Sequence, residues 1–394
     1  MAMEPPKRIL FIAPHRLDRS PNQRFRFEQY LGALQANGFE CVVSPLLDAR
    51  DDKRLYAPGI WSKGLVLLNA LRRRVRDVFR AKQFDIVFVS REAFLTGTTW
   101  FEKELKANGP KLIFDFDDSI WLANVSEANK SLAFLKNAAK TSDLIAMSDL
   151  VFAGNAYLAE YAQRFNPKTV IIPTTIDTDE YDPQLYPKAD TEGNKPVVIG
   201  WSGSITTIQH FEFALPFLRE LKAAYGDTIE IRVIGDGNYR NPELGIVGLP
   251  WRKADELVQL SQFDIGIMPL PDDEWARGKC GLKGLQYMAM GVPTLMSPVG
   301  VNGEIIQDGV NGYLPRNPSQ WVERIRELIE NPQLRLAIGN AGRQTVVERY
   351  SVRSQSLRYV NLFRQLAGLQ PLEHLAGAEP NPQQPSLNPT PQAG

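Results

Sequence analysis

A Gly-rich basic turn between a predicted strand and a predicted helix is where this sequence most clearly suggests chemistry. The strand covers 263–270, and the turn and helix read RGKCGLKGLQYMAMGVP over 277–293. Ligands of open α/β sheets bind outside the carboxyl ends of strands, and a helix N-terminus offers unpaired N–H groups to a phosphate. Because Lys279 and Lys283 add full charges there, we predict a phosphorylated-ligand site near 277–286. A plain strand-to-helix loop is the alternative.

A second turn of small residues, Ser202-Gly203-Ser204, follows a strand predicted over 196–201. Turns of this kind form backbone nests that hold anions, although a tight turn without a ligand explains the pattern equally well. Neither turn matches GxGxxG or the phosphate loop GxxxxGK[ST]. The sequence therefore gives no support for a nicotinamide cofactor or a nucleotide-hydrolysing P-loop.

Three acidic residues, Asp115, Asp117 and Asp118, stand at the end of a strand predicted over 111–116. Clustered carboxylates can hold Mg²⁺, but acids at a strand end also cap helices and accept hydrogen bonds from hydroxyls. We favour hydroxyl binding or capping over a metal. In a continuing strand, Asp115 and Asp117 would share a face and Asp118 would point away.

Other polar residues follow predicted strands, but each alone has the character of a surface residue. They are His15, Arg16, Arg24, Arg26, Arg91 and Glu92. His210 and His374 carry little signal, and no Ser-His-Asp or Cys-His arrangement can be argued from spacing. A short helix and hairpin turn predicted over 302–314 either places Glu304 beside a ligand or only closes the fold.

Length and composition indicate an ordinary globular protein. The chain has 394 residues, which predicts two or three domains. Lys+Arg and Asp+Glu both count 45, so no net field attracts nucleic acid, and any phosphate site must be built from local groups. Two cysteines, Cys41 and Cys280, provide neither a disulfide scaffold nor metal-ligand spacing. With no signal peptide or long apolar run recognised, we expect a cytoplasmic location.

The segment 61–80 has the pattern of a basic amphipathic helix. It brings Leu65, Leu68, Leu71, Val75 and Phe79 near one another, with four arginines around them. Such a helix can lie on a membrane surface, although packing of the apolar side on the sheet is the reading we favour. A peripheral contact with the inner face of the membrane therefore stays open.

Short apolar strands alternate with helical patterns along the chain, which predicts an α/β protein with mainly parallel sheets. The predicted strands cover 7–13, 40–44, 84–90, 111–116, 144–147, 150–153, 169–172, 196–201, 230–234, 263–270 and 294–297. The predicted helices cover 24–36, 211–225, 253–261, 318–330 and 351–366. Two similar starts, near residues 7 and 196, indicate two doubly wound domains.

We expect the domain limits to follow the composition. An N-terminal domain covers 1–180, a polar linker 181–195, and a C-terminal domain 196–350. The segment 351–374 is predicted as a helix that packs back towards the N-terminal domain. The tail 375–394 is rich in Pro, Gln and Asn and is predicted to be disordered.

At these motifs the chain resembles the retaining, nucleotide-sugar-dependent glycosyltransferases of family four, which have the two-domain GT-B fold. The resemblance is best over 196–350. It is carried by VIGWSG at 198–203, DIGIMP at 264–269, the segment 279–293, and SPVGVNGEIIQDGVNG at 297–312. The first half matches only by its pattern.

The resemblance implies two Rossmann-like domains facing a cleft, with the donor on the C-terminal domain and the acceptor on the N-terminal domain. It implies transfer of a sugar from a nucleotide diphosphate to an acceptor hydroxyl, with retention and without metal or cofactor. Glycans, lipids and small molecules are all candidate acceptors. The candidate catalytic residues are Lys279, Lys283 and Asp117; the candidate donor-binding residues are Ser202, Gly203, Arg277, Gln286 and Glu304.

The chain departs from the family at its paired glutamates. Where members often carry Glu, seven residues and Glu, this sequence has Gly278 and Gln286. Gln286 can still hydrogen-bond a ribose, whereas Gly278 cannot replace a carboxylate that contacts the donor sugar. Asp273 or Glu274 could substitute. These departures keep two alternatives in view: a nucleotide-sugar epimerase on the same fold, and a non-catalytic nucleotide-sugar-binding protein.

Overall fold

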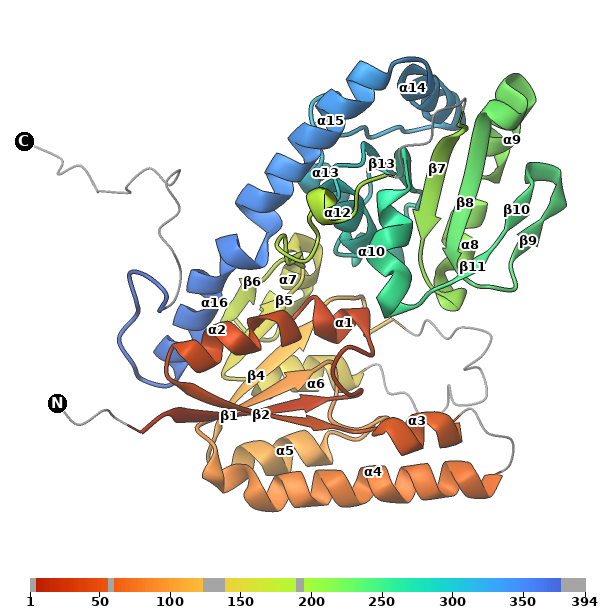
Figure 1. The fold of residues 1–394 in the computed structure, drawn as a ribbon. Helices are drawn as coiled ribbons and strands as arrows, with labels where there is room; N and C mark the ends of the chain where they lie inside the picture. The colour runs from red at the N-terminus through yellow and green to blue at the C-terminus, as the bar shows by residue number, and fades with distance from the viewer. Residues whose placement is uncertain (1–4, 56–59, 123–138, 189–194, 377–394) are drawn as a thin grey trace, which may run out of the picture.

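Two parallel sheets dominate the molecule (Figure 1). The computed structural model describes residues 5–55, 60–122, 139–188 and 195–376. The first sheet has the strand order β2-β1-β3-β4-β5-β6, and the second has the order β11-β8-β7-β12-β13. All neighbouring strands within both sheets are parallel. The predicted α/β architecture with two Rossmann-like sheets is therefore confirmed.

The strands of the first sheet are β1 (Lys7–Ala13), β2 (Phe39–Pro45), β3 (Ile86–Ser90), β4 (Lys111–Phe116), β5 (Leu150–Ala153) and β6 (Thr169–Ile171). Those of the second are β7 (Val197–Ser202), β8 (Ile229–Gly235), β11 (Leu249–Pro250), β12 (Ile265–Met268) and β13 (Thr294–Met296). A small antiparallel hairpin, β9 (Arg240–Asn241) and β10 (Ile246–Val247), stands beside the second sheet.

Helices connect these strands. In the first half they are α1 (Pro21–Arg24), α2 (Leu31–Ala36), α3 (Ala49–Leu55), α4 (Ile60–Arg80), α5 (Trp100–Ala107), α6 (Ala139–Met147) and α7 (Ala156–Gln163). In the second they are α8 (Ile208–Glu212), α9 (Leu215–Tyr225), α10 (Lys253–Ser261), α11 (Glu274–Arg277), α12 (Leu282–Ala289), α13 (Asn302–Ile305), α14 (Pro318–Glu330), α15 (Pro332–Thr345) and α16 (Val352–Leu366).

Alternating side chains of the first sheet build two apolar layers. Leu10, Ile12 and their counterparts on β3, β4 and β5 pack against the helices α4 to α7. Ile9, Phe11 and their counterparts pack on the other face against α2 and α16. This period-two division is what a parallel sheet covered on both faces requires.

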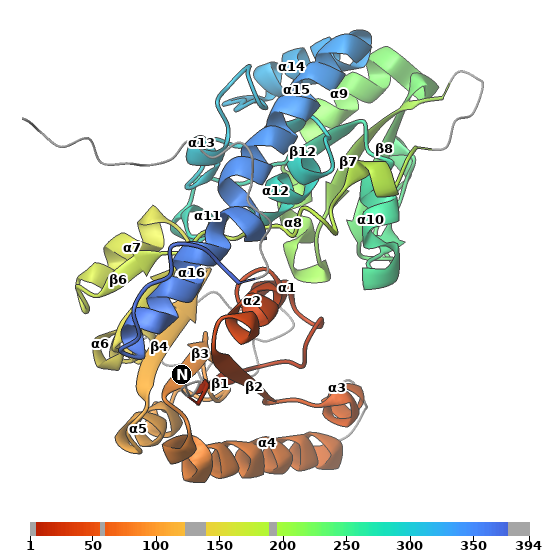
Figure 2. The same cartoon turned by 60° about the vertical axis from the view of Figure 1, so that its left-hand side comes forward.

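The last helix, α16, returns from the second half of the chain to the first sheet (Figures 1 and 2). Its buried Tyr359 stacks on Tyr30 with ring centroids 4.0 Å apart, and Phe363 lies among Phe11, Phe88 and Phe152. Each half of the chain therefore contributes to the core of the first domain.

Three predicted elements differ from the structure, and one helix is additional. The segment 144–147, predicted as a strand, is the end of α6, because a short buried apolar run has the same appearance in a helix as in a strand. The helix predicted over 24–36 is interrupted between α1 and α2. The helix predicted over 211–225 is two helices, and Pro216 stands in the first turn of the second. The helix α15 was not predicted.

The predicted tail begins slightly too early. The backbone N–H of Ala376 donates to Asn37 Oδ1 at 2.9 Å, and Leu375 packs against the core of the first domain. These two residues are therefore ordered contacts, and the remainder of the predicted tail, 377–394, lies outside the described residues.

One ion pair lies fully inside the first domain. Arg26 NH2 is 2.5 Å from Asp115 Oδ1, and both side chains are almost completely buried. Breaking such a pair leaves an uncompensated buried charge. Arg26→Met should therefore lower the free energy of unfolding by about 3–5 kcal/mol in urea titration.

The matched control is Lys7→Met, which removes the exposed pair between Lys7 and Asp85 in the same sheet. It should change the free energy of unfolding by less than about 1 kcal/mol. Equal losses in the two variants would contradict this assignment of the Arg26–Asp115 pair.

Candidate functional site

The carboxyl ends of the two sheets meet at one loop, residues 277–281, between α11 and α12. Asn155 Nδ2, just after β5, donates to the carbonyl oxygens of Arg277 at 3.3 Å and Lys279 at 3.0 Å. The hydroxyl of Ser119, after β4, donates to the carbonyl of Glu274 at 3.0 Å. The site predicted at the basic turn is therefore formed between the two domains.

Cys280 is the residue of this loop whose side chain enters the core of the first domain. Its thiol donates to the carbonyl oxygen of Asp117 at 3.2 Å, and the side chain joins the apolar core of the first domain. A methyl group at Gly154 would stand 2.3 Å from Cys280 Sγ, so only glycine leaves room for the thiol. Burial raises the pKa of this thiol, and the nearby Asp117 adds to the effect. Cys280 is therefore a docking residue held as a neutral thiol.

Two carboxylates face the loop from the first domain. Arg91 binds Asp117 at 2.6 Å and Asp118 at 2.5 Å, and Lys279 Nζ donates to Asp118 at 2.8 Å. Burial raises the pKa of Asp117, and the charge of Asp118 adds to this. Burial opposes ionisation of Asp118 too, but Lys279 and Arg91 outweigh it and lower its pKa. The expectation that Asp118 points away is wrong, because β4 ends at Phe116 and strand alternation stops there.

Arg91 itself has a strained backbone. Its φ is 63°, in the left-handed region that residues other than glycine seldom adopt. Its N–H donates to the carbonyl of Asp115 at 2.8 Å, which holds the residue in this conformation. Strain of this kind is kept where the surroundings over-determine it, and it clusters at functional sites. Here it turns the guanidinium towards both carboxylates.

Lys283 is the charged group of the site that lacks an anionic partner. The residue is half-buried, its Nζ lies 5.5 Å from the centroid of the Trp201 ring, and among the described residues it makes no hydrogen bond or ion pair. Desolvation and the neighbouring charge of Lys279 lower its pKa to about 8. A lysine in the first turn of a helix also opposes the helix dipole. The arrangement therefore favours a bound anion.

The start of α12 is open to such an anion. Its cap residue is Gly281, with φ of 70°, and no side chain caps the helix. The first N–H groups of a helix have no acceptor within it, so they are available to a ligand. Together with Lys283 they form a positively polarised surface within 277–286, the segment predicted to bind a phosphorylated ligand, and that binding stays a prediction.

His210 belongs to the same cluster, although the sequence offered little reason to select it. It is buried on α8, and its Nδ1 has no hydrogen-bond partner among the described residues. Burial and the positive charges of Lys283 and Lys279 lower its pKa to about 4. A neutral imidazole here can donate one hydrogen bond to a ligand without adding charge.

The small-residue turn does not offer a free backbone nest. The N–H groups of Ser202, Gly203 and Ser204 donate to Tyr287 Oη at 2.7 Å, Ile234 O at 2.8 Å and Thr207 Oγ1 at 2.9 Å. The nest interpretation is therefore wrong for this conformation. A side chain at Gly203 would collide with the Trp201 ring, so this glycine allows the ring to lie beneath Lys283.

Gln286 lies in a buried polar network between the domains. Its Nε2 donates to Tyr181 Oη at 2.9 Å and Glu256 Oε1 at 3.0 Å. Glu256 also binds Arg24 of the first domain at 2.6 Å and the Trp251 indole N–H at 3.1 Å. Only Gln286 Oε1 is left without a hydrogen bond among the described residues, so the predicted ribose contact would use this oxygen.

Three other predicted positions lie around the cluster without joining it. Arg277 is exposed and pairs with Asp272 at 2.8 Å. Glu304 is exposed on α13, and no described partner forms a hydrogen bond or ion pair with its carboxylate. Gly278 packs against Ser119, whose Oγ would lie 2.1 Å from a Cβ at that position. A carboxylate at 278 is thus incompatible with the closed contact seen here.

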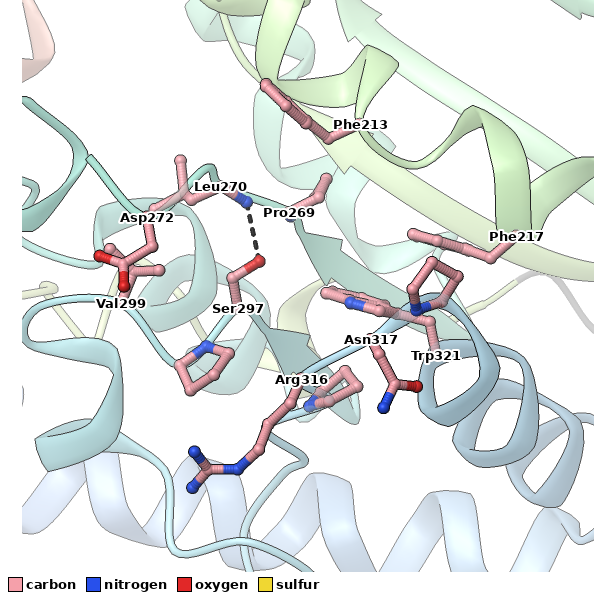
Figure 3. Close-up of a pocket in the computed structure, with 13 residues that line it drawn as sticks. Phe213, Phe217, Pro269, Leu270, Asp272, Ser297, Val299, Arg316, Asn317 and Trp321 are labelled. Atoms are coloured by element: carbon pink, nitrogen blue, oxygen red, sulfur yellow. Dashed lines mark hydrogen bonds between the residues drawn. The ribbon is translucent and has the colours of Figure 1, made fainter.

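A separate cavity of about 400 Å³ opens beyond the ends of β12 and β13. Figure 3 shows the aromatic rings of Phe217 and Trp321 on one side and Arg316 and Asp272 on others. Among the predicted site residues none lines it. The cavity therefore lies apart from the basic cluster.

No group of three or more His, Cys, Asp or Glu side chains with metal-binding geometry occurs among the described residues. Asp115, Asp117 and Asp118 are each bonded to a basic side chain. The proposed role of these acids as hydrogen-bond acceptors stays a prediction.

Comparison with known proteins adds the family context. Residues 196–331 match the family model described as Glycosyl transferases group 1. A protein of Methanocaldococcus jannaschii described as an uncharacterized glycosyltransferase is 32% identical over 123 residues, which cover 29% of this chain and 34% of that protein. Spore coat protein SA of Bacillus subtilis is 38% identical over 62 residues, or 15% of this chain and 16% of that protein. The chain therefore spans about a third or less of these two relatives.

Solved structures resemble nearly the whole chain. A glycosyltransferase of Rickettsia africae superposes with a TM-score of 0.62 at 15% identity, covering 92% of this chain and 98% of that one. Sucrose-phosphate synthase of Thermosynechococcus elongatus gives 0.64 at 15% identity, covering 92% and 99%. HepE of Anabaena gives 0.61 at 15% identity, covering 90% and 98%.

The protein has the GT-B fold. Its two sheets present their carboxyl ends to the loop at 277–281, and the part matched by the family model contains Lys279, Lys283 and His210. The basic cluster therefore lies at the domain junction of a GT-B protein.

The depressed pKa of Lys283 can be tested directly. In Lys279→Met, removal of the neighbouring positive charge should raise the pKa of Lys283 above its value of about 8. Titration of ¹³C-dimethylated lysine by NMR, with Lys283→Arg for assignment, measures both values. A Lys283 resonance that titrates near 10.5 in the unsubstituted protein, or no shift in Lys279→Met, would refute the assigned electrostatics.

Proposed function

We propose that the protein is a glycosyltransferase that moves a sugar from a nucleotide-diphosphate donor to an acceptor hydroxyl, with retention and without metal. The observation that carries this proposal is Lys283: a half-buried ammonium without an anionic partner among the described residues, beside the uncapped start of α12. A diphosphate supplies the charge that this position lacks.

The comparisons support a nucleotide-sugar donor. The family match covers the region that contains the basic cluster, and structures of Anabaena HepE are described as complexes with UDP and glucose and with UDP-glucose. We extend only the class of donor to this chain, a nucleotide-diphosphate sugar.

Each residue of the cluster has a role in the proposed transfer. Lys283 and the N–H groups of α12 stabilise the charge that develops on the leaving diphosphate. Lys279 pairs with Asp118 and can exchange this partner for a phosphate oxygen. His210 donates a neutral hydrogen bond. In the proposed step the acceptor oxygen bonds to the anomeric carbon on the face that the diphosphate leaves, the bond from that carbon to the phosphate oxygen breaks, and the leaving phosphate oxygen accepts the hydroxyl proton. No protein nucleophile is needed.

The acceptor approaches from the first domain in this proposal. Asp117, held by Arg91, follows the end of β4, and its backbone carbonyl oxygen accepts from the Cys280 thiol in the loop that contains Lys279. Its oxygens can accept a hydrogen bond from a hydroxyl and orient it. The docked loop and closed domains limit water near the donor.

The charge of Lys283 predicts a pH dependence for donor binding. Its pKa of about 8 in the free protein means that the ammonium loses its proton as pH rises through that value. Because only the protonated form attracts phosphate, the dissociation constant of a nucleoside diphosphate that binds should increase between pH 7 and 9. Calorimetry on Lys283→Met should show no such increase; an identical pH dependence would exclude Lys283 from the site.

Activity provides the test of the proposal. Screening UDP-, GDP- and dTDP-sugars against an acceptor panel should give a glycosylated product with the anomeric configuration of the donor. Lys283→Met should lower kcat/KM. The loss of transition-state stabilisation calculated from that decrease should be about 1.5–3 kcal/mol, the effect of a lost charged hydrogen bond. Lys222→Met is the matched control, because Lys222 pairs with Asp227 just before β8, at the amino end of that strand.

Several outcomes would overturn parts of the proposal. Loss of activity in EDTA, restored by Mg²⁺, would contradict metal independence. Inversion at the anomeric carbon would contradict retention. Conversion of the donor sugar without any acceptor would indicate an epimerase, and nucleotide-sugar binding with no turnover across the panel would indicate a non-catalytic protein.

A further inference from the structure

The helix α4 has two apolar sides, and the larger side chains are on the one that faces away from the protein. Val66, Ala70 and Val78 are buried, and Ala70 and Val78 belong to the core packed on the first sheet. Trp61, by contrast, is 91% exposed and Phe79 is 73% exposed. The expectation that the stripe of Leu65, Leu68, Leu71, Val75 and Phe79 packs on the sheet is therefore wrong: of these five, only Val75 packs against that core, and it is partly exposed.

The exposed apolar side chains lie in one stripe along the helix, which Arg72 and Arg76 interrupt between Leu68 and Phe79. Trp61, Leu65, Leu68 and Phe79 are separated by four, three and eleven residues, spacings that return to the same side of a helix. At 1.5 Å per residue, the 21 residues of α4 extend over about 31 Å. Large apolar side chains gathered on one exposed side of a helix are typical of an interaction surface.

The charges on the same surface are all positive. Arg72 and Arg76 are exposed within the stripe. Asp77, the one acidic residue of α4, is buried and bound by Arg74 and Arg80. No acidic side chain of α4 is therefore exposed, although the whole chain has zero net charge.

This surface lies at the periphery of the molecule. Figures 1 and 2 show α4 along the outer edge of the first domain, on the side away from the second sheet. No helix in the described part of the chain is long and apolar enough to cross a bilayer. A contact made by α4 would therefore lie in the plane of a surface.

A second copy of the chain fits this surface poorly. In a twofold dimer the same patch meets itself, which would bring the arginines of one copy towards those of the other. An anionic bilayer instead pairs arginines with phosphate groups and receives the Trp and Leu side chains at the headgroup boundary. We propose that α4 docks the protein on the surface of an anionic membrane through Trp61, Leu65, Leu68, Phe79, Arg72 and Arg76.

The docking surface and the candidate site are connected by topology. In the chain, α4 connects the parallel strands β2 and β3, so it runs antiparallel to them. Trp61, near its start, therefore stands at the end of the sheet where the strands have their carboxyl ends. Arg91, Asp117 and Asp118 are at the same end. If the proposed transferase function holds, a membrane-embedded acceptor would reach the site from this end; membrane docking itself does not depend on that function.

Vesicle flotation with the full chain tests the docking. The protein should float with vesicles of phosphatidylcholine and phosphatidylglycerol in equal parts, and much less with phosphatidylcholine alone. The double variant Leu65→Gln/Leu68→Gln should lower the partition coefficient at least tenfold. Each of Arg72→Gln and Arg76→Gln should lower it about fivefold. Leu336→Gln, which changes a leucine of α15 in the second domain that is more exposed than Leu65 or Leu68, is the control and should bind as the unsubstituted protein does.

Tryptophan fluorescence locates the contact. Anionic vesicles containing brominated lipid should quench the unsubstituted protein, and Trp61→Phe should remove most of that quenching while still floating. The proposal is overturned if the protein does not bind anionic vesicles, if the α4 variants bind as well as the control, or if sedimentation shows a dimer that the Leu65→Gln/Leu68→Gln variant dissociates. Because flotation requires no donor, its failure is distinguishable from failure of the transferase proposal.

Discussion

The insertion of one loop of the second domain into the strand ends of the first is the contact on which the candidate site depends. Cys280 enters the core of the first domain next to Gly154, and Asn155 Nδ2 donates to the carbonyl oxygens of Arg277 and Lys279, which precede it in the loop. This docking places Lys279 against Asp118. Without it, the carboxyl ends of β4 and β5 would not be joined to the start of α12, and the basic and acidic groups would belong to separate surfaces.

The electrostatics of the junction follow from that contact. The acids of the first domain are bonded to Arg26, Arg91 and Lys279, so their charges are balanced within the protein. Lys283 has no described anionic partner, and desolvation together with its fellow lysine lowers its pKa. The acids of this site are paired with basic side chains, whereas Lys283 has no described anionic partner. The site is therefore complementary to an anion. The GT-B fold places the carboxyl ends of its two sheets opposite each other, and the charged residues of this chain lie there.

The sequence predicted the repeating parts of this arrangement well. Apolar strands such as β1, β4 and β7 follow from short continuous apolar runs, and the location of the basic turn follows from the placement of its glycines. Both are local signals. The wrong predictions have local causes as well. The segment 144–147 is a short apolar run whose spacing does not distinguish a strand from a helix, and no helical pattern was recognised in the sequence of α15. His210, Arg24 and Glu256 were not assigned to the site because their importance arises only when elements far apart in the chain are brought together.

The amphipathic character of 61–80 could be predicted, but not which side would be buried. Small side chains such as Ala70 fit against the sheet, and Arg74 is buried because Asp77 and backbone carbonyl groups satisfy it. The sequence pattern favours burial of the side of α4 that has the large apolar side chains. Close packing against β-strands favours burial of the side that has small ones. The consequence is an outward apolar and basic surface along the outer edge of the first domain, on the side away from the second sheet.

Thermal unfolding with UDP, GDP, dTDP and ADP, each compared with its nucleoside, tests the central claim most directly. If the junction is a diphosphate site, one diphosphate at about 100 times its dissociation constant should stabilise the protein by about 2.7 kcal/mol. Its nucleoside at the same concentration should stabilise it far less, because Lys283 and the start of α12 contact only the phosphates. Equal stabilisation by nucleoside and diphosphate, or none by any of the four, would contradict the assignment of this junction as the donor site.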